Sequence, residues 1–199
     1  SQAKGRSKVV PLLEALHPRR VMPLKSNFEL MAEYNQGMNE NIYQAASKLS
    51  ESYLAKDQCA FFGSIINTLN HILVGDTIWL QRFANYLEHF PVLDYVRELE
   101  TPKSLDTVLY SEFSRLKEKR EKMDELIKLF IKELTDEVIS EPLLYKNTKG
   151  QAFTKNFGHI LQHFFNHQTH HRGQVSTLLF QQGIDVGVTD LLVNIPNAE

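Results

Sequence analysis

The chain of 199 residues has little cysteine, no long hydrophobic run and no large excess of charge of either sign. Its single cysteine, Cys59, excludes an internal disulfide and is typical of a reducing compartment. No apolar run approaches the roughly 20 residues that a membrane-spanning helix needs. The formal net charge of −2 does not indicate a protein that coats nucleic acid. These absences predict a cytoplasmic globular protein that binds neither membranes nor nucleic acids.

The charge is distributed unevenly along the chain. Residues 1–25 contain six basic residues and one acidic residue, a net charge of +5, so the remainder carries −7. We therefore divide the chain into a basic N-terminal extension, residues 1–26, and one domain, residues 27–199. Apolar residues in and near the extension are expected to pack on the domain surface; they are Leu12, Leu13, Leu16, Val21 and Leu24.

Four long segments place apolar residues at helical spacing. They are residues 27–50, 57–87, 104–134 and 156–182. Ser26 with Glu29 predicts a capping box for the first helix, Ser104 predicts the cap of the third, and Gly183 predicts a left-handed stop after the fourth. The charge-dense stretch LKEKREKMDE, residues 116–125, alternates in sign and indicates a solvated face of the third helix.

A short β-hairpin is predicted between the third and fourth helices. Residues 138–145 are expected to pair with residues 151–154 across a turn at Lys149-Gly150, and Pro142 restricts the first strand to a sheet edge. The tail GIDVGVTDLLVNIP is expected to fold back over the helices. The predicted fold class is all-α, a four-helix bundle with one small hairpin, and the long connections around the third helix permit a non-meander topology.

The segment HFFNHQTHHRGQ, residues 163–174, contains four of the eight histidines of the chain. Histidines four residues apart lie on one face of a helix and can present two imidazole nitrogens to one metal ion. The candidate pairs are His163 with His167 and His167 with His171. A third ligand has to come from another helix, because one helix cannot surround an ion.

His71, in NTLNHILVGDTIW, is the candidate for this third ligand. It lies in the most apolar helix, has no carboxylate three or four residues away, and is followed one turn later by Gly75, which leaves space beside it. An imidazole in such a helix needs a polar partner. A hydrogen-bonded core histidine is the competing interpretation, and the residues alone do not choose the pair that binds.

Two longer stretches, NTLNHILVGDTIWLQRF and LQHFFNHQTHHRGQVSTLLFQQGIDVGVTDLL, resemble the DinB/YfiT-like family of metal-binding four-helix bundles. The resemblance is strongest to the DinB proper branch and extends from about residue 28 to residue 195. It implies three metal ligands, His71, His167 and His171, and leaves His163 and His170 beside the site. His170 is expected to be a packed or solvated residue, with support of a ligand or proton relay as the alternative.

The resemblance also implies roles for residues around the ligands. Gly173 is expected to permit close helix contact, and Arg172 and Gln174 are expected to stabilise packing or an interface. Tyr34 and Asn35, in the first helix, are expected to reach the open side of the site.

The function implied is that of a divalent-metal-binding protein containing zinc, nickel or iron. Relatives of this fold are similar in using the metal for thiol-dependent transfer or isomerisation, with a low-molecular-weight bacterial thiol as cosubstrate. The prediction is therefore a metal-dependent enzyme, a thiol-dependent transferase or hydrolase, that forms a homodimer. The alternative is a stress-response protein without enzymatic activity that binds a metal or a small ligand.

Overall fold

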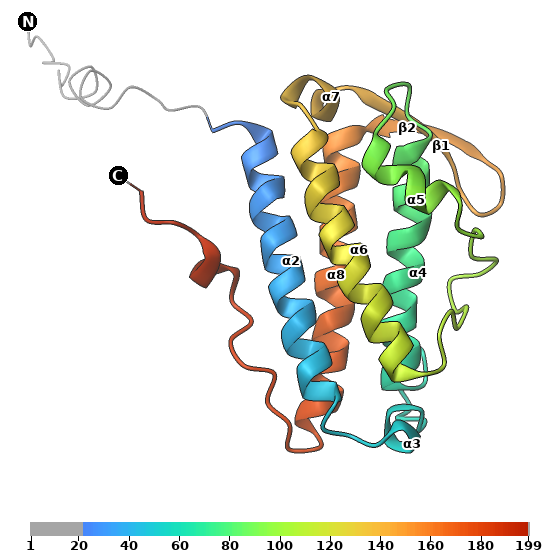
Figure 1. Cartoon of the computed structure of the whole chain (residues 1–199), viewed down its shortest axis with the longest axis vertical. Helices are drawn as coiled ribbons and strands as arrows, with labels where there is room; N and C mark the ends of the chain where they lie inside the picture. Colours follow the sequence, from blue (N-terminus) through green and yellow to red (C-terminus); the bar gives the residue numbers. More distant parts are fainter. Residues whose placement is uncertain (1–21, 199) are drawn as a thin grey trace, which may run out of the picture.

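The structure is a computed structural model that describes residues 22–198, so the predicted packing of residues 1–21 lies outside the described residues. Four long helices lie side by side and form the predicted bundle (Figure 1). They are α2 (Leu24–Ala46), α4 (Ile65–Ala84), α6 (Phe113–Glu133) and α8 (Phe157–Phe180). Short helices lie in the connections between them: α3 (Glu51–Leu54), the 3₁₀ turn η1 (Pro91–Leu93), α5 (Asp94–Arg97) and α7 (Asp136–Ser140). A second 3₁₀ turn, η2 (Leu191–Asn194), lies in the tail after α8.

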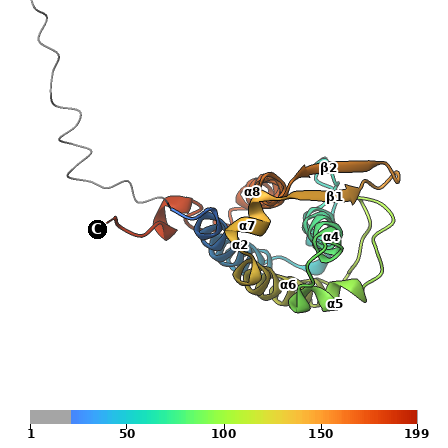
Figure 2. The same ribbon diagram turned by 90° about the horizontal axis from the view of Figure 1, so that it is seen from above.

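Helix α6 runs parallel to α4, not antiparallel to it as in a simple up-and-down bundle. After α5 the chain returns along the whole length of the bundle, so α4 and α6 run in the same direction while α2 and α8 run in the opposite one (Figure 1). Viewed from above, the four helices surround a common core, with the hairpin across α4 and α8 (Figure 2). This returning segment, residues 98–112, brings Leu105 against α4, where its carbonyl oxygen lies 2.7 Å from Nδ1 of His71.

The predicted hairpin is present between α7 and α8. Strand β1 (Pro142–Lys146) pairs antiparallel with β2 (Ala152–Asn156), and Gly150 in the turn has a positive φ of 79°. Residues 138–140, predicted as strand, instead belong to α7, because the hydroxyl of Thr135 accepts the amide of Val138 and starts a helical turn there. Pro142 is the first residue of β1, a position where its missing N–H is tolerated.

Three of the predicted helix starts are wrong. Helix α2 begins at Leu24 after Pro23, and the hydroxyl of Ser26 donates to the Pro23 carbonyl instead of capping the helix. Helix α4 begins only at Ile65, where Ser64 accepts the Asn67 amide; residues 57–64 form a turn in which Gly63 has a φ of 81°. Helix α6 begins at Phe113, and residue 104 belongs to the returning segment.

The end of the fourth helix agrees with the prediction. Helix α8 ends at Phe180, and Gly183 takes the left-handed conformation with a φ of 74°. The tail then begins along the bundle as expected: Ile184 and Val186 pack against the core, and the Tyr34 hydroxyl donates to the Thr189 carbonyl.

The core changes in character along the bundle. An aromatic cluster fills the end near the hairpin, where the ring of Phe83 lies 5.0 Å from Phe157, 5.4 Å from Phe130 and 6.0 Å from Phe164. Further along α4 and α8 the buried residues become polar, and the candidate site lies there. Among the described residues, no helix has both the length and the apolar character needed to cross a membrane.

Candidate metal centre

Three histidines from two neighbouring helices converge between α4 and α8. The Nε2 atom of His71 lies 3.0 Å from Nε2 of His167 and 3.1 Å from Nε2 of His171. His71 and His171 are buried and His167 is partly buried, and the ligand atoms all lie within 4.8 Å of one another. The structure thus brings together the three histidines that the family resemblance implies as ligands, and their arrangement could hold a metal ion.

In His71 and His171, the partner of the outer nitrogen, Nδ1, determines which ring nitrogen carries the proton. Nδ1 of His71 lies 2.7 Å from the carbonyl oxygen of Leu105, and Nδ1 of His171 lies 2.7 Å from Oε1 of Gln174. Both oxygens only accept, so both Nδ1 atoms carry the proton and both Nε2 atoms carry a lone pair. Two lone pairs 3.1 Å apart repel each other unless a cation lies between them. The donor set therefore fits a divalent ion that binds imidazole.

The surroundings also favour the neutral form of all three rings. Burial lowers the pKa of His71 and that of His171. Burial, followed by the neighbouring histidines, lowers the pKa of His167 to about 3. Neutral imidazole is the form that binds metals, so the rings need not lose a proton near pH 7 to do so.

Gly75 provides the space for one of the three rings. A Cβ atom at this position would lie 2.7 Å from Cε1 of His167, which is too close for any real contact. The space that we predicted beside Gly75 is therefore filled by His167. The expectation for Gly173 is wrong, because a Cβ atom there would meet no atom within 4 Å.

Other aromatic rings border the cluster. Phe62, in the turn before α4, stacks on His71 with ring centroids 3.9 Å apart. The exposed rings of His170 and His163 lie 4.8 Å from His171 and 6.2 Å from His167, respectively. Within residues 22–198, the cluster contains no fourth histidine, cysteine or carboxylate. Sequence reasoning missed Phe62, because its apolar spacing made it look like part of the helix.

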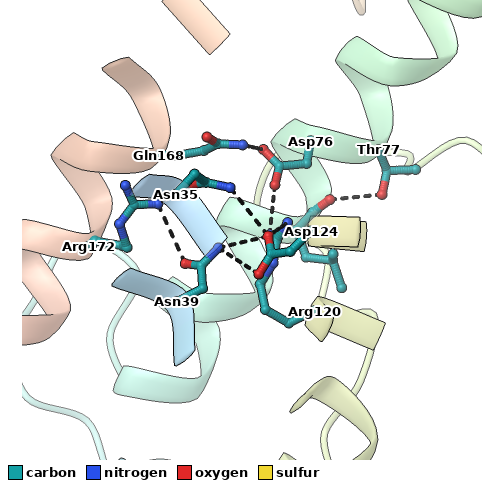
Figure 3. Close-up of polar contacts among 9 residues, drawn as sticks. Asn35, Asn39, Asp76, Thr77, Arg120, Asp124, Gln168 and Arg172 are labelled. Carbon is teal, nitrogen blue, oxygen red and sulfur yellow. Dashed lines mark hydrogen bonds and ion pairs between the residues drawn. The ribbon is translucent and has the colours of Figure 1, made fainter. Parts of the chain in front are cut away.

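A buried polar network joins residues of all four long helices (Figure 3). Its residues are Asn35 and Asn39 from α2, Asp76 from α4, Arg120 and Asp124 from α6, and Gln168 and Arg172 from α8. Arg120 lies 2.6 Å from Asp76 and 2.7 Å from Asp124, and Gln168 donates to Asp76 at 2.7 Å. Because Gln168 and Arg172 directly follow His167 and His171 in sequence, the network holds the ligand-bearing turn of α8 against α4.

The network corrects two expectations from the sequence. Arg120 and Asp124 belong to the stretch predicted as a solvated face, yet each is only 2% exposed. Burial by itself would lower the pKa of Arg120, but the carboxylates of Asp124 and Asp76 raise it above its ordinary value, so the guanidinium stays charged. Asn35 donates to Asp124 and accepts from Arg172, and Tyr34 bonds Thr189, so neither reaches the histidines.

Comparisons with known proteins agree with this architecture. The sequence model of the DinB family matches residues 22–198, which include all four long helices and the three histidines. The chain is also similar to Protein DinB of Bacillus subtilis (strain 168), with 24% identity over 160 residues that cover 79% of this chain and 87% of that protein. The chain therefore belongs to the DinB family.

Proposed function

We propose that the chain binds a divalent metal ion through His71, His167 and His171 and acts as a metal-dependent enzyme. The observation that carries this proposal is the approach of Nε2 of His71 and Nε2 of His171 to 3.1 Å, while Nδ1 of each ring lies 2.7 Å from an oxygen acceptor. Zinc, nickel and iron(II) all suit imidazole ligands. We assign the chemistry to thiol-dependent transfer or to hydrolysis.

The number of ligands supports an enzyme over a structural metal site. Structural zinc sites use four protein ligands, whereas catalytic sites use three and keep one position open. The cluster contains three ligand residues in the part of the chain that the structure describes. A divalent ion held by neutral imidazoles lowers the pKa of a water or thiol bound to it.

The neighbouring side chains have separate tasks in this proposal. Phe62 covers one face of His71 and excludes water there. The Leu105 carbonyl and Gln174 hold the two outer imidazole protons and keep the Nε2 atoms directed at the centre. The rings of His163 and His170 are exposed beside the ligands, where either can form a hydrogen bond with a substrate.

Metal stoichiometry tests the ligand assignment. The full chain is treated with a chelator, reloaded with zinc, nickel or cobalt(II), and measured by elemental analysis. We expect a single ion per chain, far less after His71→Ala, and nearly unchanged loading after the matched variant His163→Ala. Full loading of His71→Ala would exclude His71 as a ligand, and loss of the ion in His163→Ala would move the site by one helical turn.

Thiol consumption tests the reaction class. The metal-loaded chain is incubated with a low-molecular-weight thiol and an electrophile, and the free thiol is followed with time. We expect consumption above that of the metal-free chain and of His71→Ala. A loaded chain that neither consumes thiol nor hydrolyses model esters would favour the alternative, a metal- or ligand-binding stress-response protein without turnover.

We also propose that the chain forms a homodimer. Apolar side chains of the tail remain exposed: Val188 by 60%, Leu192 by 74% and Val193 by 67%. Contact with a second copy would remove this apolar surface from water. Light scattering at micromolar concentration should give the mass of a dimer, and a monomeric mass would contradict the proposal.

A further inference from the structure

Arg82 occupies an unusual position near the hairpin end of α4. Its guanidinium lies 4.3 Å from the ring centroid of Trp79 and 5.1 Å from that of Tyr145, which is on β1. The two rings themselves are 5.1 Å apart and meet edge to face. Arg82 is therefore held in place by aromatic rings from a helix and a strand and keeps little of the freedom of a surface arginine.

No carboxylate of the described residues forms an ion pair with Arg82. Within residues 22–198, the Arg82 side chain makes no ion pair and no hydrogen bond, whereas Arg97, Arg120 and Arg172 all have polar partners. Arg82 is only partly exposed, and burial lowers its pKa. A guanidinium has five N–H donors that need acceptors. Because the Arg82 guanidinium is half-buried and has no polar partner among the described residues, its N–H groups can bind an anion.

Two adjoining cavities, of about 340 and 390 Å³, meet at Arg82. Both are also lined by Asn85 and Lys146, and the larger one by Lys103. The described residues that line them include no acidic side chain. Glu100 approaches Lys103 at 3.8 Å, but both side chains are more than 80% exposed, so this pair leaves most of the positive charge available.

We propose that Arg82 is the anchor of an anion-binding site, occupied by the carboxylate or phosphate group of a small molecule. The planar guanidinium forms two parallel hydrogen bonds to such a group, and Lys146 and Lys103 add charge at the rim. Asn85 provides a neutral polar wall. The site lies three helical turns from His71 along α4, about 16 Å away, and it contains none of the three histidines of the candidate metal centre.

Trp79 allows a direct test, because it is the only tryptophan in the chain and lies under Arg82. Succinate, inorganic phosphate and neutral succinamide are titrated at constant ionic strength while the tryptophan fluorescence is recorded. We expect a saturable change with the two anions and none with succinamide. The relative affinity for succinate and phosphate identifies which acid group the site prefers.

Substitutions of single arginines test whether Arg82 is the residue that binds the anion. Arg82→Gln should weaken anion binding by at least about tenfold, because it removes a charge-assisted, two-point contact. Arg115→Gln is the matched control: it removes the same charge from an exposed arginine of α6 and should bind like the wild type. Equal affinity in Arg82→Gln and the wild type, or the absence of a saturable response to either anion, would overturn the proposal.

Two further measurements separate this site from folding and from the metal centre. If circular dichroism shows that Arg82→Gln is not folded, Lys146→Gln replaces it, with an expected weakening of about twofold to fivefold, and unchanged affinity would then refute the site. The titrations are repeated after chelator treatment. Equal dissociation constants are expected, so a failure of the proposed metal function would leave anion binding intact.

Discussion

Replacing Gly75 by alanine adds a single methyl group to the wall of the candidate metal centre. The new Cβ atom would lie 2.7 Å from Cε1 and 3.2 Å from Nδ1 of His167, where ordinary contacts begin at 3.4 Å. The His167 ring therefore has to retreat by about 0.7 Å or more. Metal–ligand distances are held to within about 0.2 Å, so a ring displaced this far is lost as a ligand.

The size of the expected decrease in zinc affinity follows from the loss of His167 as a ligand. Disturbing a residue that only supports a ligand costs about 10- to 100-fold in metal affinity, so losing His167 itself should weaken zinc binding by at least about 100-fold. The fold should survive, because alanine is favoured over glycine inside a helix by about 1 kcal/mol, which offsets part of the strain. We therefore expect Gly75→Ala to separate metal affinity from stability.

The assay is a zinc competition titration against a chromogenic chelator, together with urea unfolding of the metal-free chain. Gly173→Ala is the matched control, because it makes the same exchange inside α8, where the added Cβ atom meets no atom within 4 Å. It should bind zinc like the wild type. If Gly75→Ala also binds zinc with wild-type affinity, then His167 does not hold the ion and the geometric reasoning fails.

Three further outcomes are expected. Gln174→Ala, which frees the Nδ1 proton of His171, should lower zinc affinity by about 10- to 100-fold in the same titration. Asp76→Asn removes one carboxylate from the buried Arg120 and should lower the free energy of unfolding in urea by about 3–5 kcal/mol; a loss below about 1 kcal/mol would show that the network contributes little. In the folded, metal-free chain the pKa of His167 is about 3, below its ordinary value of 6.5. Between these two pH values the unfolded chain therefore binds more protons than the folded chain. The free energy of unfolding should fall as the pH drops below about 6.5. His167→Gln should make the thermal unfolding of the metal-free chain less dependent on pH over this range, and an unchanged slope would contradict the depressed pKa.

The four helices could be predicted because each presents a long apolar face at helical spacing. Their starts could not be predicted as well, because residues 57–64 keep that spacing through Phe61 and Phe62 although Gly63 turns the chain there. In the same way, the alternating charges of residues 116–125 do not reveal which of them face inward. Arg120 is buried because Asp76, on another helix, lies opposite it.

The sequence by itself determined that His167 and His171 share one face of one helix, since four residues make about one helical turn. It also determined that His71 lies in a helix too apolar to remain exposed. Only the tertiary structure decided that these imidazoles meet, that the returning segment brings the Leu105 carbonyl to His71, and that Gly75 makes room for His167. The reason is physical: helical periodicity is a local property of consecutive residues, whereas the facing of two helices depends on packing between residues about a hundred positions apart.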